Sequence, residues 1–91
     1  MANHKSALKR IRSSEKRRQR NRVVRGSTRS AVRRARTTIA GKDMAVAEVA
    51  VHDAVSALDK AAAKGVIHKN SAARRKSRLM RQLNRAQQPA A

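Results

Sequence analysis

Residues 43–63 read DMAVAEVAVHDAVSALDKAAA and carry the helical pattern from which the fold follows. Apolar side chains recur at helical spacing along one side, and polar side chains occupy the other. Asp43 stands directly before the pattern, where an aspartate can cap the N-terminus of a helix. The stretch predicts the core helix of the protein. Its apolar side comprises Met44, Ala47, Val51, Ala54, Val55, Leu58 and Ala62, and its polar side comprises Glu48, His52, Ser56, Asp59 and Lys60.

The two flanking parts of the chain differ sharply from this stretch in charge. Residues 1–42 contain 15 basic side chains and one acidic one, residues 43–63 contain one and four, and residues 64–91 contain eight and none. Gly41 and Gly65 fall at the borders, where a glycine in the left-handed conformation can close a helix. The pattern predicts one all-α domain over residues 1–91, a three-helix bundle with helices at about 6–40, 44–64 and 69–86 and a flexible tail at 87–91.

The first predicted helix is long and basic, and only its second half offers an apolar side to a core. Between Arg12 and Arg22 no apolar side chain occurs, so this part must lie against water or an anion. The sequence therefore predicts that the helix extends beyond the core. Gly26 lies within the pattern and weakens the helix by about 1 kcal/mol relative to alanine. The apolar stripe consists of Val24, Thr28, Ala31, Val32, Ala35 and Ile39, and an earlier apolar spot consists of Leu8 and Ile11.

The third predicted helix carries an apolar row and a basic row. This pattern predicts packing on one side and binding on the other, with the arginines opposite the leucines. Met44 and Met80 are interpreted as core side chains, because methionine fills irregular gaps in a core. The apolar row is Ala72, Ala73, Leu79, Met80 and Leu83, and the basic row is Arg74, Arg75, Arg78, Arg81 and Arg85.

The composition indicates a polyanionic partner. Lys and Arg number 24 against five acidic residues, which gives a formal net charge of +19 and leaves the free chain strongly self-repelling. Nucleic acid, an anionic membrane surface or an acidic protein could supply the opposite charge. Aromatic residues are absent, which argues against proteins that stack single-stranded bases on aromatic rings. No apolar run reaches the roughly 18 residues of a membrane span.

The sequence offers no convincing catalytic or metal site. Glu48, His52 and Ser56 are spaced as one row on a helix, but a short exposed row cannot exclude water from a reaction. Cysteine is absent, and the histidines and aspartates lack the spacing of metal ligands. We therefore predict that the chain is not an enzyme and uses no cofactor, metal or small-molecule substrate.

Clusters of basic residues are the most informative feature for function. A soluble surface normally mixes both signs of charge, whereas Glu15 alone interrupts the basic run of the first helix. Arginine predominates, and its guanidinium group suits bidentate contact with phosphate. Arginines along the whole length of two helices favour RNA over the localised base reading of DNA-binding helices, but a nucleoid-type DNA-binding protein stays an alternative. A membrane-binding helix would carry large apolar residues opposite its charge. The clusters are Lys9, Arg10 and Arg12; Lys16, Arg17, Arg18, Arg20, Arg22 and Arg25; Arg33, Arg34 and Arg36; and Arg74, Arg75, Lys76 and Arg78.

Two motifs resemble the family of bacterial small-subunit ribosomal protein twenty. Residues 1–10 (MANHKSALKR) resemble the family's N-terminus, and residues 63–79 (AKGVIHKNSAARRKSRL) are similar to its junction between the second and third helices. The resemblance implies a three-helix bundle at the foot of the small subunit that binds naked ribosomal RNA early in assembly and touches more than one RNA domain.

Charge and resemblance together give the expected function and contacts. We expect a cytoplasmic, monomeric constituent of the small ribosomal subunit that binds 16S ribosomal RNA, bridges neighbouring RNA segments and makes few protein contacts. Gly65 is expected to end a helix, while His68 and Asn70 could serve as caps or as RNA ligands. The expected RNA contacts are Lys5, Lys9, Arg10, Arg12, Lys16, Arg17, Arg18, Arg20, Arg22, Arg25, Arg33, Arg34, Lys64, His68, Lys69, Asn70, Arg74, Arg75, Lys76 and Arg78.

Overall fold

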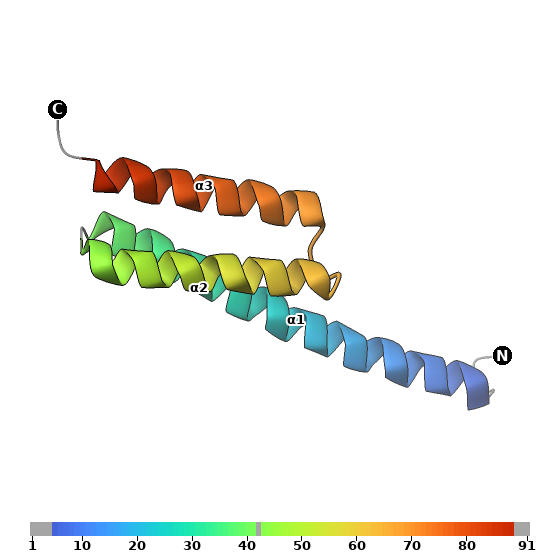
Figure 1. Ribbon diagram of the computed structural model, residues 1–91. Helices are drawn as coiled ribbons and strands as arrows, with labels where there is room; N and C mark the ends of the chain where they lie inside the picture. Colours follow the sequence, from blue (N-terminus) through green and yellow to red (C-terminus); the bar gives the residue numbers. More distant parts are fainter. Residues whose placement is uncertain (1–4, 42, 89–91) are drawn as a thin grey trace.

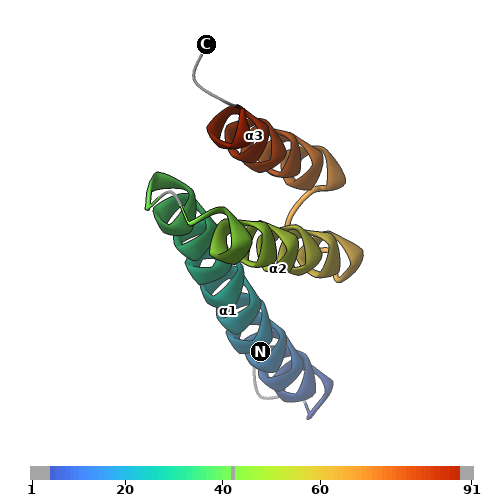
Figure 2. The same cartoon turned by 60° about the vertical axis from the view of Figure 1, so that its left-hand side comes forward.

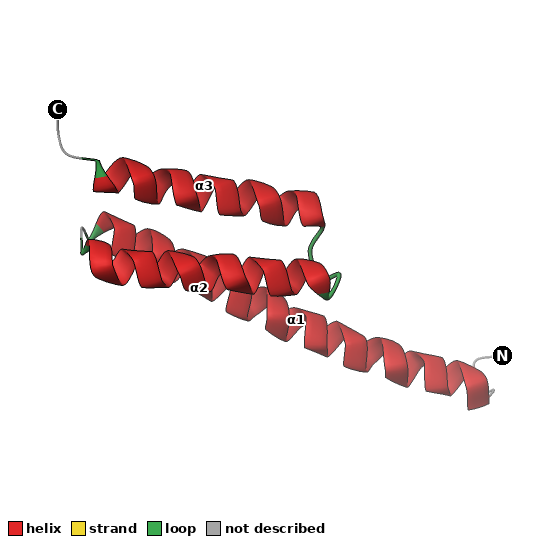
Figure 3. Cartoon of the chain, in the orientation of Figure 1, coloured by secondary structure: helices red, strands yellow, loops and turns green. Residues whose placement is uncertain are grey.

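The computed structural model describes residues 5–41 and 43–88, and it contains three helices and no strand within them. The helices are α1 (Lys5–Ala40), α2 (Met44–Ala63) and α3 (Lys69–Gln87), joined by two short turns (Figure 1 and Figure 3). The all-α fold predicted from the sequence is confirmed. Three of the six predicted helix bounds agree with the observed ones and the other three differ by one residue, and residues 89–91 of the predicted tail lie outside the described residues.

Helix α2 lies between the other two helices (Figure 1 and Figure 2). It packs extensively against α1 on one side and α3 on the other, whereas α1 and α3 meet at few positions. The predicted apolar side of α2 is confirmed for its central residues, but the buried surface is wider than predicted. Ala50 and Ala61, which the pattern left out, are 6% and 0% exposed. A helix with a neighbour on each of two sides must bury more than one stripe.

The core is built largely from alanine and valine, with Leu58 and Leu79 as its largest fully buried side chains. From α1 it takes Thr28, Val32 and Ala35, all in the second half of the helix. The buried Thr28 hydroxyl donates to the carbonyl of Val24 at 2.7 Å, so its burial leaves no unpaired polar group.

Local capping interactions set the helix ends around α2. The Asp43 carboxylate accepts from the amide of Val46 at 3.4 Å, as the sequence predicts for the N-cap. At the other end Gly65 adopts the left-handed conformation with φ +75°, its amide donates to Ala62 and the amide of Val66 donates to Ala61. These are the two hydrogen bonds of a Schellman motif, so Gly65 is a helix stop.

Two other sequence expectations about burial and turns are wrong. Gly41 does not adopt the left-handed conformation, and its amide continues the helical hydrogen bonds by donating to Thr37 at 3.0 Å. Met80 is 53% exposed and does not belong to the core, and Ala73 is also exposed. Both side chains lie about 100° or more around α3 from the buried Leu79, and no neighbouring helix covers that side.

The first half of α1 extends away from α2 and α3, which makes the protein elongated (Figure 1). The principal extents are 69 × 21 × 15 Å, and the radius of gyration of 18.1 Å exceeds the roughly 12 Å expected for a compact domain of this length. Every residue from Leu8 to Arg20 is exposed, including Ile11 at 52%. The prediction that the first helix extends beyond the core is therefore confirmed.

Candidate nucleic-acid interface

The projecting part of α1, residues 5–22, is strongly basic, and we name it the basic arm. It holds nine lysines and arginines and one acid, Glu15, and all ten of these side chains are exposed. Within the described part of the chain the single ion pair lies elsewhere, between Lys76 and Asp59. The arm therefore presents a helical rod of unpaired cations on all sides, which is suited to a polyanion.

One hollow on the arm is lined by several arginines and lies near the point where α1 joins the bundle. Arg17, Arg18 and Arg25 surround an open hollow of about 290 Å³ with Ser14 and Asn21. Guanidinium and amide groups at such spacing can donate to several oxygens of a phosphate chain. The structure thus brings together three members of the cluster that the sequence singled out, Arg17, Arg18 and Arg25.

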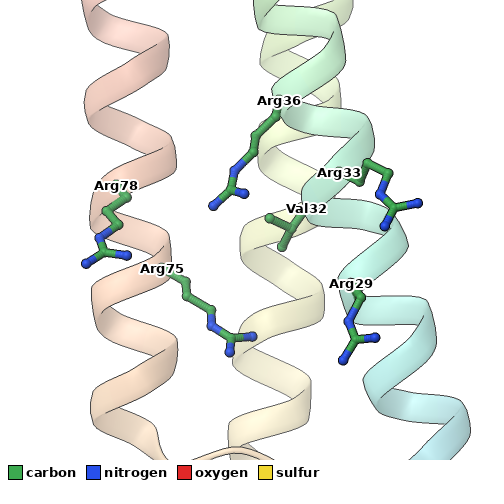
Figure 4. A pocket seen from close by; sticks show the side chains of 6 residues that line it. All are labelled: Arg29, Val32, Arg33, Arg36, Arg75 and Arg78. Atoms are coloured by element: carbon green, nitrogen blue, oxygen red, sulfur yellow. The ribbon is translucent and has the colours of Figure 1, made fainter.

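A second concentration of positive charge lies between α1 and α3, and we name it the arginine groove. It encloses about 360 Å³, within the range of about 300–1,000 Å³ that is typical of ligand sites. Arg36 of α1 and Arg75 of α3 both extend into the space between the two helices, at different heights along it, while Arg33 and Arg78 lie at the outer edges (Figure 4). The groove is lined by Arg29, Val32, Arg33, Arg36, Arg75 and Arg78.

The groove corrects the predicted faces of the third helix. The sequence predicts that Arg75 and Arg78 lie opposite the leucines, yet both line the groove beside the packed side of α3, Arg75 extending toward α1 and Arg78 at the outer edge (Figure 4). Arg75 precedes the buried Leu79 by four residues, so the two share one side of the helix. The sequence pattern predicts a packed side that includes both Leu79 and Met80. Because Met80 is exposed, the packed side is centred on Leu79 and lies closer to Arg75 than predicted.

Arg36 belongs to a predicted basic cluster but is absent from the expected RNA contacts, and Arg29 was missed in the sequence altogether. It precedes Arg33 by four residues and Arg36 by seven, and this spacing aligns all three on one flank of α1. This alignment of three arginines on the flank beside the apolar Val32 could have indicated from the sequence that Arg29 belongs to a basic surface next to the core. It was overlooked because Arg29 stands alone in the sequence, whereas the predicted clusters were runs of adjacent basic residues.

Lys76 has a partner within the protein, which the charge pattern did not predict. Its ammonium nitrogen lies 2.6 Å from a carboxylate oxygen of Asp59 on α2, and the two side chains are 31% and 55% exposed. The Gln87 side-chain amide also donates to the carboxylate of Glu48 on α2. These polar contacts tie α3 to α2 along its length, and among residues 5–41 and 43–88 no side-chain contact of this kind joins α3 to α1.

The turn between α2 and α3 places the other predicted contacts at the surface. His68 caps α3, because its Nδ1 accepts from the amide of Asn70 at 3.1 Å. Lys64, Lys69 and the side chain of Asn70 are exposed. Lys64 also borders a hollow shared with Ser27 of α1. The turn therefore lies beside the middle of α1, close to the end of the basic arm that adjoins the bundle.

The described residues offer no catalytic arrangement. Glu48 and His52 are exposed on α2 and Glu48 is bonded to Gln87, while Ser56 borders only the open hollow beside Lys64. Among residues 5–41 and 43–88 no three acidic or histidine side chains gather closely enough to hold a metal ion. In that same part of the chain no helix has both the length and the apolar composition needed to cross a membrane.

Comparison with known proteins places the chain in a family. A family model described as ribosomal protein S20 matches residues 2–84. Small ribosomal subunit protein bS20 of Thermomicrobium roseum is 51% identical over 84 residues, which cover 92% of this chain and 85% of the relative. The bS20 proteins of Geotalea uraniireducens and Bacillus mycoides are 51% and 48% identical over 84 residues, covering 92% of this chain and 97% and 99% of the relatives. The chain, with its three helices and arginine-rich surfaces, therefore belongs to the ribosomal protein S20 family, a family of ribosomal proteins and not of enzymes.

Proposed function

We propose that this chain is a structural constituent of the bacterial small ribosomal subunit that binds 16S ribosomal RNA directly and bridges neighbouring RNA segments. It acts in the cytoplasm as one copy per subunit, without a reaction of its own. The observation that carries this proposal is the presence of two unpaired basic surfaces, the arm and the arginine groove, on one elongated molecule.

The arrangement of charge favours contact with RNA phosphates over reading of bases. Arginines run along the whole of α1 and recur on α3, rather than gathering at the start of one helix that could enter a DNA major groove. Folded RNA is recognised mainly by its shape and backbone, which a rod of guanidinium groups can follow. The S20 family membership points to the same partner, because the relatives are named as small ribosomal subunit proteins.

Bridging follows from the length of α1. Its 36 residues span roughly 54 Å at 1.5 Å per residue, so the arm reaches RNA well beyond the bundle. Basic side chains on the arm and others around the arginine groove neutralise phosphates of two RNA segments that otherwise repel each other. The mechanism is therefore neutralisation of charge and fixing of mutual geometry. The alanine-rich core keeps α2 and α3 in place beside α1.

Direct binding is tested by mixing the purified chain with naked 16S ribosomal RNA, free of other ribosomal proteins, and sedimenting the mixture. We expect the protein to migrate with the RNA. If it stays at the top of the gradient at low salt, direct binding is wrong, and the chain enters the subunit through other components.

Bridging needs a separate test with two labelled fragments of 16S RNA that do not pair with each other. We expect the wild-type chain to capture both fragments in one complex. A variant in which Lys16, Arg17 and Arg18 of the arm are glutamine should bind one fragment and fail to retain the second. Simultaneous capture of both fragments by this variant would contradict a bridging role of the arm.

A further inference from the structure

The contact between α1 and α3 is the weakest in the bundle. Both helices pack on α2, but they touch each other at few positions and the arginine groove separates them. The two polar contacts of α3 that link it to another helix both lead to α2, through Lys76 and Gln87. Within the described residues, no polar contact joins α3 to α1.

The groove concentrates charge that the protein itself does not neutralise. Five arginines surround it, and in the described part of the chain none of the five forms an ion pair or a side-chain hydrogen bond with the protein. Arg36 and Arg75 reach into the same groove from opposite walls (Figure 4), so their like charges repel each other and disfavour close approach of the two helices. An anion between them would reverse the sign of this interaction.

We propose that a stretch of RNA sugar–phosphate backbone occupies the arginine groove and completes the bundle by linking α1 to α3. This inference rests on the proposed function, since the occupant is a segment of the bound RNA. Phosphate oxygens accept paired hydrogen bonds from Arg36 on one wall and Arg75 on the other, in the bidentate geometry that guanidinium groups favour. Val32, which is 9% exposed, forms the apolar floor and leaves the arginines as the groups that face the backbone.

Three features favour a phosphate backbone as the occupant. The only charged groups on its walls are arginines and the groove is open to the surface, so part of an anionic chain can enter it from outside. Its volume of about 360 Å³ leaves room for a larger occupant than a single water molecule or monatomic ion. Aromatic rings that could stack a base are absent from the sequence.

The test compares two double variants that remove the same charge from the same helices. The groove variant is R36Q/R75Q, and the matched control is R34Q/R74Q. Arg34 lies two residues before Arg36, about 200° around α1, and neither Arg34 nor Arg74 lines the groove. Circular dichroism first establishes that both variants are helical, and R36K/R75K, which keeps the charge but loses the guanidinium fork, serves as a second groove variant.

The first measurement is thermal unfolding with inorganic tripolyphosphate against sodium chloride at equal ionic strength. We expect tripolyphosphate at about 100-fold its dissociation constant to raise the Tm of the wild type and of R34Q/R74Q by at least about 5 °C. The groove variant should show less than half of that rise, and R36K/R75K an intermediate one. Equal rises in the groove variant and the control would mean that tripolyphosphate binds the basic surface at large, and the groove proposal is then wrong.

The second measurement is affinity for 16S RNA, which separates this proposal from the proposed function. We expect R36Q/R75Q to lose at least about 10-fold more affinity than R34Q/R74Q, because charged hydrogen bonds on both walls are lost. If the wild type binds the RNA and both variants lose affinity equally, the groove proposal fails while RNA binding stands. If the wild type does not bind the RNA, the proposed function fails, and so does the assignment of RNA as the groove's occupant.

Discussion

The basic arm is a helix without tertiary support, and we expect it to unfold readily in the absence of RNA. Residues 5–22 contain six like-charged pairs at i, i+3 or i, i+4 spacing, against two attractive pairs that Glu15 forms with Arg12 and Arg18. A net four repulsive pairs at roughly 0.2–0.5 kcal/mol each disfavour the helix by about 1–2 kcal/mol. Every side chain from Leu8 to Arg20 is exposed, so no packing offsets this repulsion.

The substitution Lys16→Glu tests this reasoning. Lys16 lies four residues after Arg12 and four before Arg20, and the change turns two repulsive pairs into two attractive ones. The arm helix should gain about 1–2 kcal/mol, which lowers its local opening equilibrium roughly 4- to 30-fold. Lys16→Gln, the matched control, removes the repulsion without adding attraction and should give about half of the gain in free energy.

Hydrogen exchange of the free protein measures the effect amide by amide. In the wild type, amides from Lys9 to Arg22 should exchange within seconds, while those from Val46 to Leu58 in α2 are protected. Lys16→Glu should slow exchange in the arm and leave α2 unchanged, although it weakens RNA binding by placing a negative charge against phosphate. Wild-type protection in the arm equal to that of α2 would refute the reasoning, as would an unchanged rate in Lys16→Glu.

Three further predictions address the fold, each tested by urea unfolding. A methyl group at Gly26 meets no atom within 4 Å, so Gly26→Ala should raise the free energy of unfolding by about 0.5–1 kcal/mol, and a decrease would contradict an unstrained helix at this position. Gly65→Ala should lower the free energy of unfolding by about 1–2 kcal/mol because φ of Gly65 is +75°. Gly41 has an ordinary backbone conformation, so Gly41→Ala should change this free energy by less than about 0.5 kcal/mol. Equal losses in the two variants would argue against a left-handed helix stop at Gly65. Leu79→Ala should lower the free energy of unfolding by about 2–5 kcal/mol, whereas Met80→Ala at the neighbouring position should lower it by less than about 0.5 kcal/mol. A large loss in Met80→Ala would mean that Met80 is a core side chain.

The helix borders could be predicted from the sequence because they depend on local interactions. Asp43 needs only the first turn of α2 to act as a cap, and the left-handed turn at Gly65 needs only the last turn. The projection of the arm was also predictable, since residues between Arg12 and Arg22 have no apolar side chain to bury.

The packed sides of the helices could not be predicted as well, because they depend on where neighbouring helices lie. Alanine fits either a core or a surface, so the sequence could not decide that Ala50 and Ala61 are buried while Ala73 is exposed. Met80 looked like a core residue, but no helix covers it. The arginine groove combines residues about 40 positions apart in the sequence, and its existence depends on the position of α3 relative to α1.

The central claim is that the unpaired arginines bind the phosphates of 16S ribosomal RNA in preference to other polyanions. Filter binding across a salt series, with 16S RNA and with duplex DNA of equal length, tests it most directly. With on the order of eight phosphate contacts, the log–log dependence of affinity on salt should have a slope of about −5 to −7. We predict tighter binding to the RNA at every salt concentration, whereas equal affinity for RNA and DNA throughout the series would contradict the claim and favour a nucleoid-type DNA-binding protein.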